Sequence, residues 1–285
     1  MALNSVNTNN GAMVALQALT RTNDQLSVTQ KRISTGYRVA DAKDDGAAFA
    51  VAQSVRADVS GLQSANEQLG YSKGILDTTL SGLNSVSDNM SDVKGLLVKL
   101  ADDALSADQR AQYETQYTDL RTQIANTLRD ASYNNRTLLT PDAAGPAGAA
   151  PTNLTSGDVV TVRNELGTTY TIAETDAATL TVAAAPTDSA SAIAALADGG
   201  DFSTVMNTIN DTLNTYGSAS RYLDSQVSFN KEKMDALEGG VGALVDADLA
   251  KESARLQSLQ IRQQLGTQSL SIANQAPQTL LSLFN

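Results

Sequence analysis

The fold of this chain is decided by residues 55–97, whose sequence is VRADVSGLQSANEQLGYSKGILDTTLSGLNSVSDNMSDVKGLL. Apolar residues recur in this stretch at strict seven-residue intervals, at Val55, Leu62, Leu69, Leu76, Leu83, Met90 and Leu97. A sustained period of seven predicts one long helix that presents one apolar face to another helix. At about 1.5 Å per residue the helix spans roughly 60–65 Å, which suits a structural rod better than a substrate-enclosing domain.

A second heptad series lies far along the chain and supplies a partner for this helix. Asn230 is its only interruption, and its apolar members are Ile209, Tyr216, Leu223, Leu237 and Leu244. We predict that the two helices pack within one chain, although the first series taken alone would also suit a coiled-coil dimer. A capping box at residues 106–109 predicts a further helix over residues 107–131.

The composition excludes several classes of function. The chain of 285 residues has no Cys and no His, which removes thiolate nucleophiles, disulfides and the side chain most used for acid–base chemistry near neutral pH. Its formal net charge of −11 argues against binding nucleic acid. No apolar run approaches the roughly 20 residues of a membrane span, and no basic start precedes an apolar run. We therefore expect no membrane contact and no cleaved signal peptide.

The remaining catalytic candidates are three carboxylate pairs, Asp44/Asp45, Asp102/Asp103 and Asp246/Asp248. All three lie near predicted helix ends, where acidic residues are expected for capping and for the helix dipole. A Ca²⁺ loop is the alternative for the first pair together with Asp41, but the spacing does not fit an EF-hand. Phosphate-binding, dinucleotide-binding and hydrolase motifs do not occur. We expect a protein that is not an enzyme and that needs no metal or other cofactor.

Both ends of the chain are amphipathic and yet lack charge. Residues 1–20 and 263–285 contain no charged side chain, and their polar faces carry Asn, Gln, Ser and Thr. Because a solvated helix face usually carries charge, we predict that these ends are buried against other chains. Frayed, disordered termini are the alternative. The candidate subunit-interface residues are Leu3, Val6, Met13, Leu16, Leu19, Leu26, Ile33, Leu256, Leu259, Ile261, Leu265, Leu270, Ile272, Leu280, Leu281 and Leu283.

A polar connector separates the first helix from the long one. It covers residues 34–46, is bracketed by two glycines, and is too polar to continue either apolar stripe. We predict that the long helix begins near its acidic end, where negative charge suits a helix N-terminus. The candidate connector residues are Gly36, Arg38, Lys43, Asp44 and Asp45.

Residues 141–200 differ in composition from the rest of the chain. They contain four of the five prolines and seven acidic residues against the single base Arg163. Alternating patterns at 158–163 and 168–174, separated by a turn, predict a β-hairpin, and residues 179–182 predict a third short strand. We interpret this segment as a small exposed insertion.

The predicted fold class is therefore mainly α, a long antiparallel helical bundle or coiled coil formed by the N- and C-terminal segments. We expect three parts: residues 1–43 with 245–285 as a terminal assembly domain, residues 44–140 with 201–244 as a helical rod domain, and residues 141–200 as a small β-rich insertion.

Two segments resemble bacterial flagellin. The N-terminal half is similar to this family from residue 3 to residue 139, most specifically in residues 30–45, QKRISTGYRVADAKDD. The C-terminal segment is similar in DADLAKE (246–252), IRQQLG (261–266), ANQAPQ (273–278) and LLSLF (280–284). Both sets of motifs lie at the corresponding ends, in the same order, around an unrelated middle. The short insertion is typical of alphaproteobacterial flagellins.

The resemblance implies a subunit that self-assembles into the helical flagellar filament, the extracellular propeller used for swimming. It implies export through the flagellar secretion channel, with an export chaperone, a filament cap and hook-associated proteins as partners. In the family the two terminal helices, here residues 3–33 and 248–284, pair and line the inside of the tube. The alternatives are a hook–filament junction protein, a surface adhesin or polysaccharide-binding protein on the same scaffold, and an unrelated coiled-coil scaffold.

One motif departs from the family. Flagellins recognised by the animal innate flagellin receptor tend to carry an Arg and a Glu where this chain has Asp92 and Gly95, on either side of Lys94. We therefore predict weak or absent recognition by this receptor.

Overall fold

The computed structural model describes residues 8–140 and 153–281, and among these the side chains of residues 276–281 are left undescribed. Its contacts divide the chain into two compact units. We call residues 1–57 with 235–285 the terminal unit and residues 58–234 the central unit. The main helices are α1 (Asn10–Thr35), α2 (Gly46–Leu100), α3 (Ala107–Asp130), α4 (Ser189–Leu196), α5 (Asp201–Val245) and α6 (Leu249–Leu281). The predicted mainly α fold class is confirmed, whereas the division into three domains stays a prediction.

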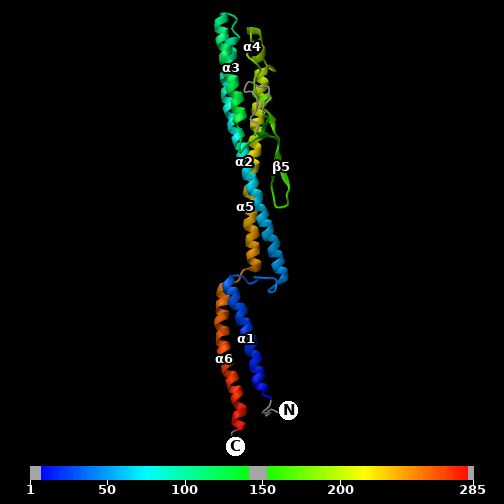
Figure 1. Ribbon diagram of the computed structural model, residues 1–285, viewed down its shortest axis with the longest axis vertical. Coiled ribbons are helices and arrows are strands. Elements are labelled where there is room, and N and C mark those ends of the chain that lie inside the picture. Colours follow the sequence, from blue (N-terminus) through cyan, green and yellow to red (C-terminus); the bar gives the residue numbers. More distant parts are fainter. Residues whose placement is uncertain (1–7, 141–152, 282–285) are drawn as a thin grey trace. The chain divides into compact units, whose positions relative to one another are not determined.

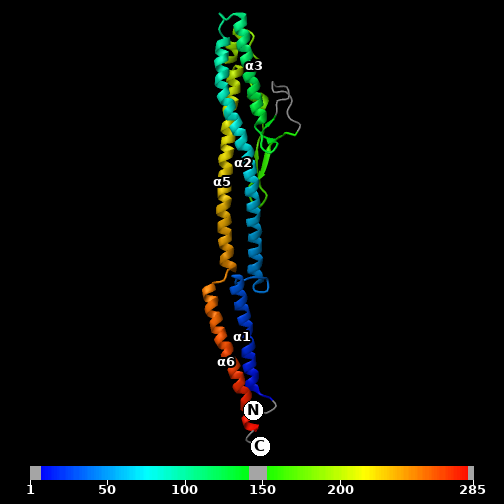
Figure 2. The same ribbon diagram turned by 60° about the vertical axis from the view of Figure 1, so that its left-hand side comes forward.

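The terminal unit is built on α1 and α6, which lie side by side in both ribbon views (Figures 1 and 2). The two helices run antiparallel. Near one end, the Asn9 side chain donates a 2.6 Å hydrogen bond to the carbonyl of Ala273, and further along Gln263 donates to Asn23 at 2.8 Å. Helices α1 and α6 therefore form an antiparallel pair, as expected for the predicted bundle of N- and C-terminal segments.

A small apolar cluster lies in the same unit, where the connector meets the nearby ends of α2 and α5. Its buried members are Val39, Ala52, Val241 and Val245, and Val55 is partly buried against them. The first residue of the predicted heptad series therefore packs in the terminal unit, and the rest of the series belongs to the central unit.

The core of the central unit is the predicted heptad seam. Six residues of α2 on this series are fully buried, namely Leu62, Leu69, Leu76, Leu83, Met90 and Leu97. On α5 the matching residues Ile209, Tyr216 and Leu223 are also buried. The third predicted helix, α3, adds Tyr117, Ile124 and Leu128 to the same core. The seam is thus formed within one chain.

The central unit also contains three two-stranded sheets. Strands β4 (Val159–Val162) and β5 (Thr169–Ile172) form the predicted antiparallel hairpin. The other two sheets are parallel and join β1 (Arg136–Thr137) to β3 (Thr155–Ser156) and β2 (Leu139–Thr140) to β6 (Thr175–Asp176).

The predicted third strand at residues 179–182 is wrong. Residues Ala177–Leu180 form a 3₁₀ helix, which Asp176 caps by accepting a 2.9 Å hydrogen bond from the amide of Ala178. The capping carboxylate favours a helical turn at this point. Leu180 and Val182 are nonetheless fully buried, and their burial is what the alternating pattern had detected.

Asn230 interrupts the heptad series of α5 because it contacts the hairpin. The residue is fully buried, and its amide nitrogen donates to Asn66 Oδ1 at 2.9 Å and to the carbonyl of Arg163 at 3.0 Å. Its side-chain oxygen accepts a 2.9 Å hydrogen bond from Gln226. A buried amide is tolerated only when its hydrogen bonds are satisfied, and here the satisfying partners come from α2 and from the hairpin.

We expect Asn230→Ala to lower the free energy of unfolding by about 1–3 kcal/mol, because Asn66 and the carbonyl of Arg163 lose a buried partner. Urea denaturation of the monomer measures this change. The matched control is Asn214→Ala, which alters an exposed Asn of the same helix and should stay within about 0.5 kcal/mol. Equal effects of the two substitutions would contradict this role for Asn230.

Candidate functional site

The inner faces of α1 and α6 are narrow and contain many small residues. On α1 the inner-face residues with reduced exposure are Ala12, Ala15, Leu19, Thr22, Leu26, Thr29 and Ile33. On α6 they are Glu252, Leu256, Leu259, Gln263, Gly266, Leu270 and Ala273. Both sets alternate steps of three and four residues, as in a two-helix coiled coil. At Gly266 an added Cβ would lie 3.3 Å from the Leu19 side chain, so the helices approach closely.

The outer faces of the same helices expose large apolar side chains. On α1, Met13 is 65% exposed and Val14 is 67% exposed. On α6, Ile261, Leu265 and Ile272 are 58%, 59% and 63% exposed. At about 100° per residue, these three α6 residues fall within about 40° of one another, on the side away from the buried Leu259. Aligned exposed apolar side chains of this kind are typical of surfaces that bind another molecule.

The predicted interface residues therefore fall into separate groups. Six of them are partly or fully buried on the inner faces: Leu19, Leu26, Ile33, Leu256, Leu259 and Leu270. Five are exposed: Met13, Leu16, Ile261, Leu265 and Ile272. Leu3, Val6 and Leu283 lie outside the described residues, as do the side chains of Leu280 and Leu281. Sequence reasoning missed Val14 and Val28, which are exposed but lie off the heptad series.

An ion pair joins the two helices near the connector. Arg32 Nη1 lies 3.1 Å from Glu252 Oε1, and Glu252 is only 8% exposed. A buried carboxylate requires a compensating charge, which Arg32 supplies. Sequence reasoning missed this pair because its members are separated by 220 positions.

The connector is held by backbone contacts to the α5–α6 junction. Gly36 ends α1 in a left-handed conformation with φ of 74°, and its amide donates to the carbonyl of Arg32 at 2.9 Å. The amide of Arg38 then donates to the carbonyl of Val245 at 2.7 Å, and the Arg38 side chain donates to the carbonyl of Leu244. Arg38 thus joins the connector to the α5–α6 junction, and so does the carbonyl of Gly36, which accepts a 2.9 Å hydrogen bond from the amide of Ala247.

The acidic end of the connector caps the long helix, as predicted. Asp45 Oδ1 accepts hydrogen bonds from the amides of Ala47 and Ala48, both at 3.1 Å. Asp44 instead accepts a 3.0 Å hydrogen bond from the amide of Ala40. The two neighbouring carboxylates therefore have different partners.

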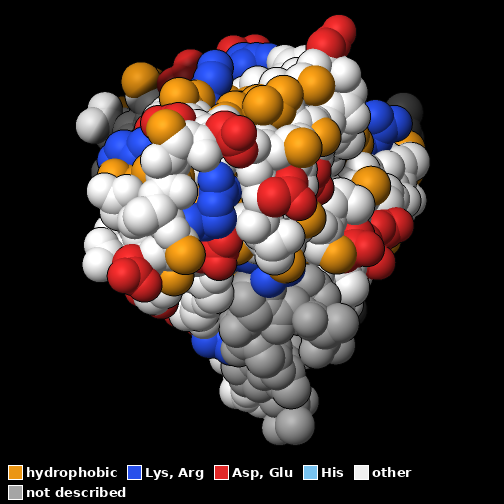
Figure 3. Space-filling view, turned by 90° about the horizontal axis from the view of Figure 1, so that it is seen from above, with side chains coloured by type: hydrophobic (Ala, Val, Ile, Leu, Met, Phe, Trp, Pro, Cys, Tyr) orange, Lys and Arg blue, Asp and Glu red, His pale blue; other side chains and the backbone are white. Residues whose placement is uncertain are grey.

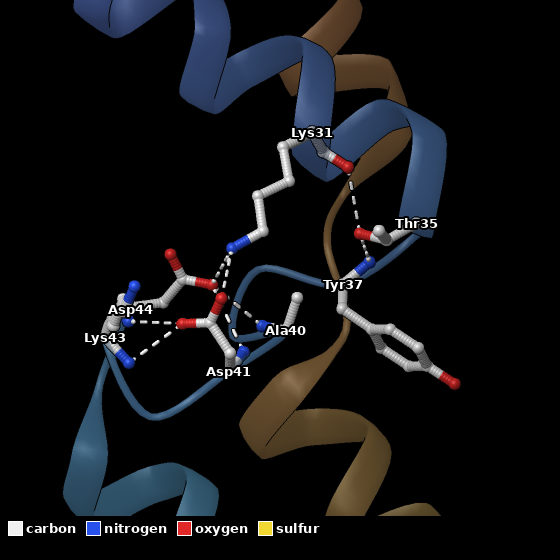
Figure 4. A network of polar contacts seen from close by, with 7 residues as sticks. All are labelled: Lys31, Thr35, Tyr37, Ala40, Asp41, Lys43 and Asp44. Atoms are coloured by element: carbon white, nitrogen blue, oxygen red, sulfur yellow. Dashed lines mark hydrogen bonds and ion pairs between the residues drawn. The ribbon is translucent and has the colours of Figure 1, made fainter.

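One lysine organises the polar network of the connector (Figure 4). Lys31 Nζ lies 2.8 Å from Asp41 Oδ2 and 2.9 Å from Asp44 Oδ2. The amide of Lys43 also donates to Asp41 Oδ1 at 2.8 Å. Hydrogen bonds from Lys31 lower the pKa of both carboxyls, and the same contacts raise the pKa of Lys31. Two of the three carboxylates that sequence reasoning weighed as Ca²⁺ ligands, Asp41 and Asp44, thus bind a cation of the chain itself.

This network predicts how the connector responds to pH. A carboxyl whose pKa is lowered by folding stabilises the folded form above its unfolded pKa of about 3.9, and this stabilisation is lost as pH falls through the folded pKa. We expect the contacts of Asp41 and Asp44 to persist at neutral pH and to break below about pH 4. In Lys31→Gln the carboxyl midpoints should rise toward that unfolded value. Carboxyl titration by NMR measures them, and midpoints equal to those of the unaltered chain would contradict the assignment.

The motif expected to weaken receptor recognition lies on the exposed side of α2. Asp92, Lys94 and Gly95 are all exposed, and an added Cβ at Gly95 would meet no atom within 4 Å. Their side of the helix is open in the central unit, so a binding partner would meet these residues directly.

Two regions of the chain match the helical regions of one known protein family. The N-terminal helical region of bacterial flagellin matches residues 6–143, and the C-terminal helical region of bacterial flagellin matches residues 202–284. This chain belongs to the bacterial flagellin family. The matched regions contain the α1–α6 pair and the whole heptad seam, and they leave out the hairpin region between them.

Full-length relatives of this flagellin include proteins of three alphaproteobacteria. It is 36% identical to Flagellin FljK of Caulobacter vibrioides over 100% of both chains. It is 35% identical to a flagellin of Brucella melitensis over 98% of this chain and 99% of the relative, and 31% identical to Flagellin C of Rhizobium meliloti over 99% of both. The flagellin is thus a structural subunit of the extracellular flagellar filament that drives motility. None of the helices within the described ranges is long and apolar enough to cross a membrane.

Proposed function

We propose that this flagellin polymerises through the exposed apolar outer faces of α1 and α6, which bind copies of the same chain. The single observation that carries the proposal is the exposure of Ile261, Leu265 and Ile272 in a row on α6. A soluble monomer gains nothing from such a row, whereas a polymer buries it.

The geometry of the helix pair suits an open polymer. Met13 and Val14 lie on the outer face of α1, and Leu265 lies on the outer face of α6. Because the inner faces meet each other, the two outer faces point in different directions and offer two different surfaces. Contacts between different surfaces that do not close a ring generate a helical filament.

The apolar faces are large enough to drive this association. Complete burial of one Leu, Ile or Met side chain contributes about 1.5–3 kcal/mol. Five exposed side chains of each copy would be partly buried: Met13, Val14, Ile261, Leu265 and Ile272. Their burial supplies several kcal/mol per contact, which offsets the entropy lost on association. A filament repeats this contact at every subunit, so a modest contact is sufficient.

We also propose a route of export and a set of partner proteins for this chain. The chain would leave the cell unfolded through the flagellar secretion channel. It would meet an export chaperone, the filament cap and hook-associated proteins on the way. The terminal residues 1–43 and 245–285 would form the contacts that assemble the filament. Residues 44–140 and 201–244 would form the wall of the tube, and the insertion 141–200 would lie on its outer surface. We propose no catalytic activity and no cofactor for the chain, and no binding to nucleic acid or to a membrane.

We expect weak or absent activation of the animal innate flagellin receptor, because Asp92 and Gly95 replace the Arg and Glu typical of recognised flagellins. A receptor reporter assay with the purified monomer measures this activation. The matched variant, Asp92→Arg with Gly95→Glu, should raise it, because both positions are exposed. Activation by the unaltered monomer equal to that of a recognised flagellin would contradict the expectation.

Truncation tests the assembly proposal. Purified full-length protein should elongate filament seeds, and proteins lacking residues 1–33 or 250–285 should remain monomeric. Circular dichroism shows whether the helices of the central unit remain folded in the truncated chains. Elongation by either truncated chain at the rate of the full-length protein would overturn the proposal.

A further inference from the structure

Charge is distributed unevenly along this flagellin. Helices α1 and α6 together contain six basic and two acidic residues, a net charge of +4. The central unit, residues 58–234, contains 11 basic and 22 acidic residues, a net charge of −11. The helix pair is therefore cationic in a chain that is acidic as a whole.

Three of the cations form a stripe on α6. Lys251, Arg255 and Arg262 are exposed and, at about 100° per residue, lie within about 40° of one another. Within residues 8–140 and 153–281, no carboxylate lies within ion-pair distance of any of the three. Two other cations near the connector, Lys31 and Arg32, differ because they are paired with carboxylates of their own copy. We call Lys251, Arg255 and Arg262 the cationic stripe.

The cationic stripe runs beside the apolar outer face of α6. Arg262 directly follows Ile261 in the chain, and Leu265 lies one turn further along. A surface that buries the apolar row therefore brings its partner within reach of the stripe. A cationic partner would be repelled, since like charges brought together at an interface are unfavourable.

We propose that the cationic stripe of α6 binds the acidic surface of the central unit of a neighbouring copy. This inference rests on the proposed function, because it assumes that copies meet at the outer face of α6. The charges are complementary, at +4 for the helix pair and −11 for the central unit. Acidic side chains are also accessible on that unit: Asp102, Asp103, Asp108 and Asp188 are exposed, and Figure 3 shows acidic side chains on the surface of the end near α3 and α4.

The cationic stripe would increase the rate of association more than it would stabilise the finished filament. Exposed charges are screened over about 10 Å at 0.1 M salt, so their largest effect falls on the encounter between copies at low ionic strength. Mutating charges at the rim of an interface typically changes the rate of association and its dependence on salt. The measurable consequence is therefore the elongation rate, compared at low and at high salt.

The test compares two double variants that lower the net charge of the chain by the same amount. Arg255→Gln with Arg262→Gln removes two of the three charges of the stripe, and Arg221→Gln with Lys231→Gln neutralises two exposed basic residues of the central unit. In about 0.02 M NaCl we expect the stripe variant to elongate seeds roughly tenfold more slowly than the unaltered chain, and the control variant to be slowed less than about twofold. In about 0.5 M NaCl the difference between the two variants should nearly vanish.

The outcomes separate this inference from the proposed function. If the stripe variant elongates at low salt as fast as the control variant, the inference is wrong. The inference also fails if both variants are slowed equally, because net charge alone then decides the rate. In either case a loss of elongation in Leu265→Asp at both salt concentrations would still support assembly through the apolar face.

Discussion

Replacing Leu265 with aspartate is expected to leave the flagellin monomer folded and to abolish its polymerisation. Leu265 is 59% exposed in the monomer, so the carboxylate of the variant remains in water there and the helix pair tolerates it. In a filament formed through the outer face of α6, the same carboxylate would be buried among apolar side chains, with Arg262 one turn away as its nearest cation on the same helix. Burial of a charge costs several kcal/mol even when an opposite charge lies nearby, enough to slow elongation by roughly a hundredfold or more.

Seeded elongation followed by light scattering measures this effect, with circular dichroism to check the fold. The matched control is Leu166→Asp, which places the same charge at another exposed leucine, in the turn of the hairpin. The hairpin belongs to the insertion that we place on the outer surface of the filament, so this control should elongate normally. Normal elongation by Leu265→Asp would contradict assembly through this face.

Replacing Leu83 with alanine is expected to lower the stability of the monomer strongly. It should not remove a contact of the filament, because we expect this buried side chain to touch no neighbouring copy. Leu83 is fully buried in the seam of the central unit. Truncation of a buried leucine typically lowers the free energy of unfolding by about 2–5 kcal/mol, through lost burial and the cavity left behind. Urea denaturation of the monomer measures the loss.

Leu265→Ala is the matched control for this second substitution. It removes the same atoms from an exposed site of another helix and should change the free energy of unfolding by less than about 0.5 kcal/mol. The pair of leucines thus separates stability from assembly: position 83 should govern unfolding and position 265 should govern polymerisation. Equal losses of stability at the two positions would show that the heptad seam is not the main core.

The sequence was sufficient to predict the core of the central unit. The heptads of α2 predicted six fully buried residues, and the second series predicted the α5 partner. A repeat of this kind depends on local periodicity, which the sequence shows directly. The partners of Asn230 could not be predicted, because Asn66 and Arg163 are remote in sequence and meet it only in the folded chain.

The terminal helices show where sequence reasoning stopped. Apolar periodicity identified both helices as amphipathic but could not distinguish the inner face from the outer face, because each carries leucines. Much of the inner face is made by small or polar residues such as Ala12, Thr29 and Gly266, which a search for apolar periodicity does not select. In the structure Leu19 and Leu259 lie toward the partner helix and Leu265 lies away from it. This difference in burial distinguishes the inner face from the outer face.

The most direct test of the central claim uses cysteine accessibility, because the chain has no cysteine of its own. Ile272→Cys and Leu166→Cys each introduce one reactive thiol at a site exposed in the monomer. In monomers both should react rapidly with a maleimide. In filaments we expect the thiol at position 272 to react at least about tenfold more slowly, because an interface excludes solvent from its core, and the thiol at position 166 to stay reactive. Unchanged reactivity at position 272 in filaments would contradict burial of the α6 outer face between copies.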